Sequence, residues 1–426
     1  MCDSVVAVGA ETSAGVTLFG KNCDRRADES QRFVQFVETS HPPQAQTQCT
    51  HIAIPQVPET YRVMGHSPWW VWGFEHGVNE YAVAIGNHSV FSNEPIEQTP
   101  GLIGMDLVRL GLERGRSARE ALEVIAGLIE QHGQGGAAFE PDGAGHHNAF
   151  LLADPTEAWL LETSNRHWAA RRTRLDGVSN HHSIGPDWEI GSRDLTAFAR
   201  HEGWWSNGER LDFSAAYRSR DVLSHTSEGR RRRSRELLNT GSSRHDVATL
   251  QRLLRDHSDG GSNPQQESTA DGDRDFALCA HSDPTHWTTA SVVAPLVLDL
   301  RAPWPVWVSF GTPCTGIFLP IYLHGTIPAT LARGAEQSQP DSAWWVFKKL
   351  QEAAGEDLER HTSMLRAAWA EFEDPLEGAR LTVEGLAREA SAVGGDDFAA
   401  ELVTDFMART VAEVLERAEW LCNRIG

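Results

Sequence analysis

Two short apolar runs near the start of the chain predict a β-hairpin. Residues 4–9 read Ser-Val-Val-Ala-Val-Gly, and residues 16–20 form a second apolar run. The stretch between them at residues 12–15 has the composition of a turn, and two such runs around a turn are typical of paired strands. We therefore expect the polar residues after the second run to lie beside the residues that precede the first.

Strand-length and helix-length segments alternate further along the chain. Short apolar runs at residues 81–86, 150–153 and 158–161 predict strands. Residues 101–112 carry apolar side chains at helical spacing, and Ser117 with Glu120 is typical of a capping box that starts a second helix. The glycines that end this helix lack the context of a phosphate-binding loop, so no nucleotide or other organic cofactor is expected.

The last quarter of the chain has a helical pattern. Helices are predicted at residues 343–354, 358–372, 381–392 and 398–422, with breaks at residues 373–375 and at the glycines 394 and 395. Residues 258–273 are rich in Gly, Ser, Asp and Gln and predict a surface loop. With a length of 426 residues, this organisation predicts a main domain at 1–335 and a helical C-terminal extension at 336–426. Periodicity alone gives the fold class only as α+β.

The net charge of −21 argues against nucleic acid or an anionic membrane surface as a partner, because both are negative. The basic run at residues 230–233 lies between Glu228 and Glu236, so we expect an ion-paired helix start there. The N-terminus has no apolar leader, and no long apolar run follows, so a signal peptide and a membrane span are not expected. A cytoplasmic location is the consistent expectation.

The six cysteines are spread along the chain without zinc-type spacing, so neither a disulfide framework nor a metal site is predicted. The histidine pairs 146–147 and 181–182 do not change this. Adjacent residues of a strand point to opposite faces, so neither pair can bind one ion by local geometry. His281 and His286 form a third candidate pair, and we again expect no metal.

Cys2 carries the strongest chemical indication, because it directly follows the initiator methionine. Aminopeptidases remove methionine before a small side chain, and this would leave a thiol and a free α-amine on one residue. An α-amine titrates at about 7.7–8.0 and a thiol at about 8.5, so the amine can take the proton of the thiol at little cost. The thiolate can then attack a carbonyl group. If the hairpin forms, Lys21 and Asp24 lie near Cys2, where Lys21 can lower the thiol pKa and Asp24 can hold the ammonium.

Ordered motifs along nearly the whole chain resemble the dipeptidase A and secernin family of N-terminal-nucleophile (Ntn) cysteine hydrolases, which is related to bile-salt hydrolase and penicillin V acylase. The resemblance implies a four-layer αββα sandwich, in which two stacked antiparallel sheets lie between helical layers. It also implies hydrolysis of small peptide or amide bonds through a Cys2 thioester. The motifs are residues 2–4, 15–19, 21–25, 70–73, 77–80, 84–87, 101–110, 148–154, 157–159, 168–170, 288–291 and 311–316.

By motif position, the resemblance places Asp24, Asn87 and Asn180 in the site. Asp24 is expected to position the amine, and the two asparagines, with backbone N–H groups, to hold the oxyanion. Lys21 stands where the related enzymes have an arginine, which leaves its role open. Asn79 is the alternative to Asn87 as oxyanion donor. These relatives also use a later arginine, for which spacing does not choose between Arg232, Arg233 and Arg235.

The resemblance implies dipeptides as the substrate class, with N-acyl amides as the alternative. The tryptophans at 69, 70 and 72 would line a greasier pocket for N-acyl amides, although a core position is the default for such a cluster. A non-catalytic, secernin-like regulatory protein is the alternative from another class. A homo-oligomer is compatible with the sequence, which does not fix the oligomeric state.

Overall fold

The computed structural model describes residues 2–97, 99–206, 208–222, 224–240, 244–258, 276–283 and 286–425. The predicted N-terminal hairpin is confirmed. Strand β1 (Cys2–Ala7) pairs antiparallel with β2 (Thr17–Arg25), and the short 3-10 helix η1 (Gly9–Glu11) lies in the connection. Cys2 stands opposite Cys23 in this register.

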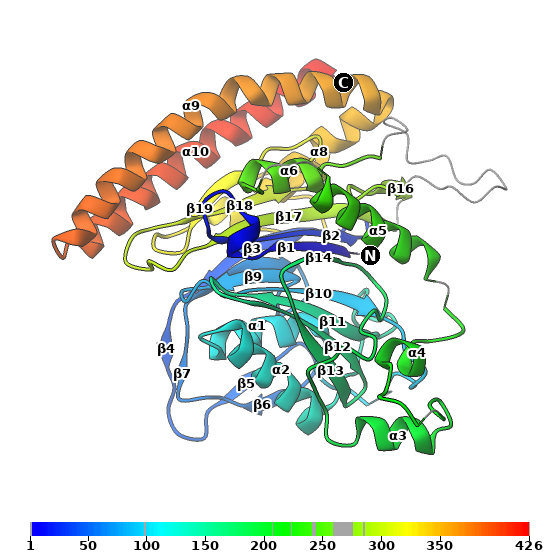
Figure 1. Cartoon of the computed structure of the whole chain (residues 1–426). Helices are drawn as coiled ribbons and strands as arrows, with labels where there is room; N and C mark the ends of the chain where they lie inside the picture. The colour runs from blue at the N-terminus through cyan, green and yellow to red at the C-terminus, as the bar shows by residue number, and fades with distance from the viewer. Residues whose placement is uncertain are drawn as a thin grey trace.

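Two large antiparallel sheets form the body of the molecule (Figure 1). The seven-stranded sheet has the order β14 (Leu175–Val178), β1, β2, β17 (His286–Leu296), β18 (Pro305–Phe310), β19 (Leu319–Tyr322), with β16 (His281–Asp283) paired to β17. The eight-stranded sheet has the order β15 (Ile190–Gly191), β13 (His167–Thr173), β12 (Ala158–Ser164), β11 (His147–Ala153), β10 (Ala84–Val90), β9 (His76–Asn79), β8 (Val63–Pro68), β3 (Gln31–Phe36). Two small ribbons pair β4 (Thr39–Ser40) with β7 (Glu59–Thr60) and β5 (Gln46–Gln48) with β6 (Ala53–Pro55).

Helices cover the outer faces of both sheets. On the eight-stranded sheet lie α1 (Gly104–Arg114) and α2 (Ala118–His132), and on the seven-stranded sheet lie α5 (His225–Asn239) and α6 (Val247–Leu254) (Figure 1). The C-terminal extension adds α8 (Ala343–Ala354), the 3-10 turn η2 (Gly355–Asp357) and the long antiparallel pair α9 (Leu358–Ala392) and α10 (Asp396–Ile425). The connecting helices are α3 (Leu195–His201), α4 (Phe213–Tyr217) and α7 (Ala329–Ala332). The expected α+β fold, with two stacked sheets between helical layers and a helical C-terminal extension, is confirmed.

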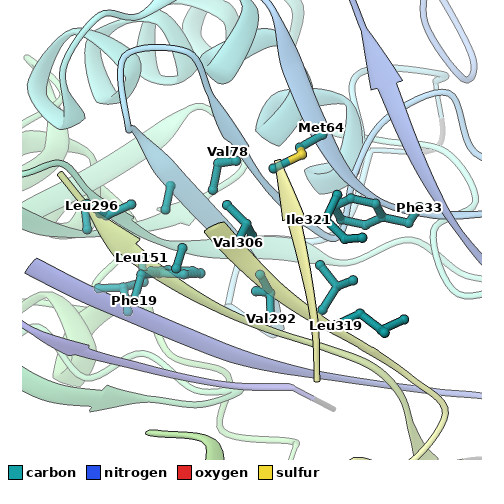
Figure 2. Packing of buried hydrophobic residues seen from close by; sticks show 14 of the residues in the cluster. Phe19, Phe33, Met64, Val78, Leu151, Val292, Leu296, Val306, Leu319 and Ile321 are labelled. Carbon is teal, nitrogen blue, oxygen red and sulfur yellow. The ribbon is translucent and has the colours of Figure 1, made fainter. Parts of the chain in front are cut away.

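The main core lies between the two sheets, where apolar side chains from both meet (Figure 2). The strand alternation divides each strand between two environments. In the central hairpin, Val6 and Phe19 point into the core between the sheets, while Val5 and Leu18 pack outward against α6 and its neighbours. The labelled members of the inter-sheet core are Phe19, Phe33, Met64, Val78, Leu151, Val292, Leu296, Val306, Leu319 and Ile321.

The predicted capping box is confirmed, since the Ser117 hydroxyl accepts a hydrogen bond from the Glu120 backbone N–H at 3.1 Å. The predicted break at residues 373–375 is wrong, because α9 continues through Pro375. Packing of α9 along α10, with Leu376 buried just beyond the proline, offsets the backbone hydrogen bond that a proline removes. Gly394 does end the helix, with a φ of 80° that suits glycine.

The basic run at residues 230–233 does not start a helix, because α5 begins five residues earlier at His225. The predicted surface loop at residues 258–273 lies almost wholly outside the described residues. Among the helices that the structure describes, none has the length and hydropathy needed to cross a membrane. The boundary between a main domain at 1–335 and an extension at 336–426 stays a prediction.

Candidate active site

Cys2 is the first described residue of β1, and its side chain is almost fully buried against Cys23 and Ala290. Alternation along β2 puts Lys21 and Cys23 on the same sheet face as Cys2, and Asp24 on the opposite face. The thiol sulfurs of Cys2 and Cys23 and a carboxylate oxygen of Glu75 all lie within 4.8 Å of one another. The hairpin register therefore sets a second thiol beside the candidate nucleophile.

The surroundings of Cys2 favour its thiolate. A hydrogen bond with the Cys23 thiol and the positive charge of Lys21 lower the pKa of Cys2 to about 6, against the opposing effect of burial. Burial and the same hydrogen bond raise the pKa of Cys23 well above its usual range. Cys23 therefore stays protonated, and its S–H group donates a hydrogen bond to the Cys2 sulfur. Cys2 is the reactive thiol of the pair.

Lys21 is fully buried, and its ammonium lies 3.9 Å from Glu75 Oε2. Burial alone would lower the pKa of Lys21, but Cys2, Cys23 and Glu75 raise it, so the side chain stays charged. Glu75 also pairs with Arg25 Nη1 at 3.1 Å. A buried cation next to two sulfurs is suited to stabilise a thiolate.

Asn180 holds the nitrogen of Cys2. The backbone nitrogen of Cys2 donates to Asn180 Oδ1 at 2.6 Å. The amide nitrogen of Asn180 in turn donates to the carbonyl and hydroxyl oxygens of Ser89, both at 3.0 Å. Both ends of this amide are engaged, so its orientation is fixed by these three hydrogen bonds and a fourth from Arg230, and its oxygen faces Cys2. This geometry favours a role in positioning the nitrogen over the expected role as an oxyanion donor.

Arg230 of α5 connects the nitrogen end of Cys2 to two acidic groups. Its Nη2 donates to Asn180 Oδ1 at 2.8 Å and to Ser179 Oγ at 2.9 Å. Its Nη1 donates to Asp3 Oδ2 at 3.0 Å and to Asp24 Oδ2 at 3.1 Å. All of these groups are buried or partly buried, and the planar fork of a guanidinium matches such a divided set of acceptors.

Asp24 is held on two sides. Arg230 contacts Oδ2, and the Thr288 hydroxyl of β17 donates to Oδ1 at 2.7 Å. Asp3 shares the same arginine, and burial raises the pKa of Asp3 to about 6 although Arg230 lowers it. One guanidinium thus forms ion pairs with two buried carboxylates, so Arg230 compensates the negative charge at this end of the site.

Asn87 lies within β10 of the opposite sheet, three residues before the strand ends. Its side-chain amide lies between two polar neighbours. With the amide turned so that its nitrogen donates to Glu75, Nδ2 lies 3.0 Å from Glu75 Oε2 and 3.1 Å from the Glu75 carbonyl oxygen. The other end of the amide is 3.3 Å from Asn148 Oδ1. The Asn87 side chain lies on the α1 side of this sheet, since a Cβ added at Gly104 of α1 would be 2.5 Å from Asn87 Nδ2, and it lines the same cavity as Cys2.

A cavity of about 230 Å³ opens at Cys2. Charged side chains line part of its wall, and Met105 and Phe139 contribute to its apolar surface. Arg26 forms an ion pair with Glu140 at 3.0 Å, and both side chains are about half exposed. The remaining wall residues are Asp24, Arg25, Glu75, Asn87, Ser89 and His146.

The structure brings Lys21, Asp24, Asn87 and Asn180 together around Cys2. It also adds Arg230, which the sequence analysis missed. The three arginines expected from spacing have other ion-pair partners: Arg232 pairs with Glu236, Arg233 with Asp256 and Arg235 with Asp176. The buried residues Ser227, Arg230, Ser234 and Leu238 follow helical spacing along α5, and this pattern of small and apolar residues could have selected Arg230.

The remaining candidate residues make structural contacts outside the cavity. Asn79 joins a turn to the end of α1: its Oδ1 accepts from the backbone N–H groups of Tyr81 and Val83, and its amide nitrogen donates to the carbonyl oxygens of Leu112 and Gly115. Trp70 donates to Glu29 at 2.6 Å, and Trp72 stacks against the Arg109 guanidinium. None of the tryptophans at 69, 70 and 72 is among the described residues that line the cavity.

Replacing Cys23 with alanine is expected to raise the pKa of Cys2 toward the usual thiol value near 8.5, because the hydrogen bond that stabilises the thiolate is removed. In the native protein, alkylation of Cys2 should rise through pH 6 and level off above it. In Cys23→Ala the midpoint should move to higher pH, and Cys23→Ser, which retains a donor, should restore much of the shift. Peptide mapping of alkylated Cys2 across pH measures this, and equal midpoints for the native and alanine proteins would contradict it.

Because Gly86 has no side chain, there is room beside it for the side chain of Lys21. A Cβ added at Gly86 would lie 2.5 Å from Lys21 Cδ and 3.1 Å from Lys21 Cε. We expect Gly86→Ala to lower the free energy of unfolding by about 1–3 kcal/mol and to slow Cys2 alkylation at pH 7. Gly127→Ala in α2 is the matched control, because its Cβ would have no neighbour within 4 Å. That change should be neutral or stabilise by up to about 1 kcal/mol in denaturant unfolding. Unchanged stability and alkylation in Gly86→Ala would show that Lys21 does not depend on this gap.

Two facing antiparallel sheets with helices on their outer faces, and a buried cysteine at the start of a central strand, agree with the fold that the sequence resemblance implied. Residues 2–226 match the family model described as peptidase family C69, which covers more than half of the chain. The chain belongs to peptidase family C69, the dipeptidase A and secernin family. Its class is that of hydrolases acting on amide bonds.

Three solved structures are also similar to this chain. The C2A variant of conjugated bile acid hydrolase from Clostridium perfringens is 12% identical, with 73% of this chain and 89% of that chain covered and a TM-score of 0.42. Penicillin V acylase from Agrobacterium tumefaciens is 14% identical, with 75% and 86% covered and a TM-score of 0.43. The Caenorhabditis elegans ortholog of N-acylethanolamine-hydrolyzing acid amidase is 12% identical, with 70% and 94% covered and a TM-score of 0.32.

Proposed function

We propose that this chain is a dipeptidase that uses Cys2 as an N-terminal nucleophile. The observation that carries the proposal is the pair of contacts on one residue. The sulfur of Cys2 is stabilised as a thiolate by Cys23 and Lys21, and its nitrogen is held by Asn180. Removal of Met1 would turn that nitrogen into an α-amine without moving its hydrogen-bond acceptor.

The proposed reaction begins with the proton on the amine. A thiol with a pKa of about 6 is more acidic than an α-ammonium, which titrates at about 7.7–8.0, so thiolate and ammonium coexist near neutral pH. The thiolate attacks the carbonyl carbon, and a C–S bond forms. The C–N bond then breaks as the α-ammonium gives its proton to the leaving amine. Water, deprotonated by the free α-amine, cleaves the thioester and releases the acid.

The surrounding residues take separate roles in this proposal. Asn180 and Arg230 fix the amine, and Asp24 fixes Arg230 from the other side. Asn87 lies on the wall of the cavity, and in this proposal one of its amide N–H groups leaves Glu75 and donates to the oxyanion, helped by backbone N–H groups. Lys21 stabilises the thiolate before attack and again when the thioester is cleaved.

Charged side chains on the cavity wall support a dipeptide as substrate. A dipeptide carries an ammonium and a carboxylate close together, and the cavity mouth offers Arg26 and Glu140 on its rim. The volume of about 230 Å³ also suits a small substrate. Met105 and Phe139 are the features that favour the alternative, an N-acyl amide.

A hydrolysis screen tests the substrate class. Dipeptides, the same dipeptides with a C-terminal carboxamide, and N-acyl amides should be compared with native protein and with Cys2→Ala. We expect hydrolysis of dipeptides, a higher KM for the carboxamides because Arg26 loses its anionic partner, and little turnover of N-acyl amides. Arg26→Gln should remove the difference in KM between dipeptide and carboxamide.

Intact mass of the purified protein accompanies the screen. A chain without Met1 and with a free Cys2 thiol is the expected species. A preference for N-acyl amides would replace the dipeptidase by an amidase on the same nucleophile. Retained Met1 or a modified Cys2, with no turnover of any substrate, would instead favour a non-catalytic, secernin-like regulatory protein.

A further inference from the structure

Four side chains with metal-binding atoms converge at a second place in the molecule, away from Cys2. They are His257, Cys279, His281 and Cys314, and their ligand atoms all lie within 4.8 Å of one another. Both cysteines and His281 are buried, and His257 is partly buried. Both sulfurs are free thiols.

The cluster is assembled from three separate segments of the chain. His257 follows the end of α6, Cys279 lies just before β16 and His281 begins it, and Cys314 lies in the connection between β18 and β19. Backbone contacts next to the ligands hold these segments together. The N–H groups of Leu278 and Cys279 both donate to the carbonyl oxygen of Asp256, at 3.1 and 3.0 Å.

The link to the third segment is a side-chain contact, in which Arg255 Nε donates to the carbonyl oxygen of Pro313 at 2.8 Å. Each ligand therefore lies within two residues of a hydrogen bond that joins its segment to another. Such support fixes a donor set before any ion binds, which lowers the entropy lost on binding.

Hydrogen bonding alone does not explain the geometry of the cluster. The Nε2 atom of His281 lies 3.1 Å from His257 Nε2, 3.3 Å from Cys279 Sγ and 3.2 Å from Cys314 Sγ. An imidazole nitrogen carries either one proton or one lone pair, so it can satisfy one of these three contacts. A cation at the centre would satisfy all four groups at once.

The donor set selects the ion. Zinc takes four ligands in a tetrahedron, with Zn–S of about 2.3 Å and Zn–N of about 2.0–2.1 Å, which separates the ligand atoms by roughly 3.3–3.8 Å. The contacts to His281 are close to these separations. Two thiolates and two imidazoles are the set typical of structural zinc, and they leave no open position for substrate.

We propose that His257, Cys279, His281 and Cys314 form a structural zinc site. The sequence predicted no metal because the ligands are separated by long stretches of chain, and local spacing cannot show a site that only tertiary folding assembles. The proposal is independent of the function proposed for Cys2.

The proposed zinc site is connected to Asp24 by hydrogen bonds. The backbone N–H of Ala280, between two of the ligands, donates to the Thr288 hydroxyl at 2.9 Å, and that hydroxyl donates to Asp24 Oδ1 at 2.7 Å. The carbonyl oxygen of Leu278 accepts from Asn22 Nδ2 at 2.8 Å. A bound ion would therefore fix the segment that supports the end of β2.

Metal content of the untagged, full-length protein tests the site. After expression with added zinc, elemental analysis should give about one zinc per chain. Cys279→Ser and Cys314→Ser should each lose most of it, while Cys422→Ser, at a partly buried cysteine of α10, should retain it. Cys2→Ala should also retain zinc. This control distinguishes zinc at the proposed site from zinc bound by the sulfurs of Cys2 and Cys23.

Measurements on the native sequence guard against variants that fail to fold. Removal of zinc by a chelator should lower Tm by at least about 5 °C, and added zinc should restore it. Cobalt(II) exchanged into the protein should give the visible spectrum of a tetrahedral thiolate site. Three results would overturn the proposal: zinc-free protein that gives no such cobalt spectrum, zinc that is lost with Cys2 instead, or a Cys279–Cys314 disulfide in non-reduced mass spectra.

Discussion

Replacing Cys2 with alanine is expected to lower kcat for the best dipeptide substrate by at least about 10³-fold. The change removes the sulfur that forms the thioester, and no described neighbour can replace it. Cys23 is the nearest thiol, but burial and its hydrogen bond to Cys2 raise its pKa well above its usual range, so it remains protonated. Steady-state kinetics on processed protein, with Met1 removal checked by intact mass, measures the loss.

Two variants sharpen this test. Cys2→Ser should retain slight activity, because the α-amine can still activate a hydroxyl, although less effectively than a thiol. Cys23→Ala keeps the nucleophile and should retain turnover, with its pH profile moved upward for the reason given above. If Cys2→Ala kept most of its activity, or if Cys23→Ala were as inactive as Cys2→Ala, the assignment of Cys2 as the nucleophile would be wrong.

Replacing Arg230 with methionine is expected to cause the second-largest loss. The guanidinium is the shared partner of Asp3 and Asp24, and removing one partner of a buried ion pair costs about 3–5 kcal/mol. Asn180 also loses the donor that holds its oxygen next to the Cys2 nitrogen. We expect kcat to fall by about 10²-fold or more together with a lower Tm.

Two controls separate the position of Arg230 from its charge and from folding. Arg232→Met removes the same charge from an exposed position on α5 and should leave kcat and Tm nearly unchanged. Arg230→Lys keeps the charge without the fork, so it should recover much of the Tm but little of kcat. Full activity in Arg230→Lys would show that charge alone is required, and a loss in Arg232→Met equal to that in Arg230→Met would remove the special role of Arg230.

The local part of the site could be predicted from the sequence, and the long-range part only by resemblance. A short hairpin brings Cys2, Lys21 and Asp24 together, because pairing across a tight connection follows from pattern and composition. Asn87 and Asn180 come from other strands, and periodicity contains no information on which strands become neighbours. Their placement near Cys2 followed from motif positions shared with the family.

Arg230 shows why a helix rich in arginine is hard to interpret. Most faces of α5 are polar, and its buried side is marked mainly by small residues, so apolar periodicity alone identifies it only weakly. The exposed residues Arg232 and Arg235 are of the same type as the buried Arg230, so residue type does not distinguish them. The long helix α9 shows the reverse error, since a proline that predicts a break is tolerated where a neighbouring helix supplies packing.

The antiparallel register between β1 and β2 limits how the sequence of this protein can evolve. Shifting one strand by a single residue would turn Lys21 and Cys23 away from Cys2 and bring Asn22 and Asp24 to their face. Insertions within the connection at residues 8–16 keep the pairing, whereas a one-residue deletion inside either strand exchanges the two sets of side chains. Length variation among descendants of this chain is therefore confined to the connection, and the strands themselves can vary only by substitution.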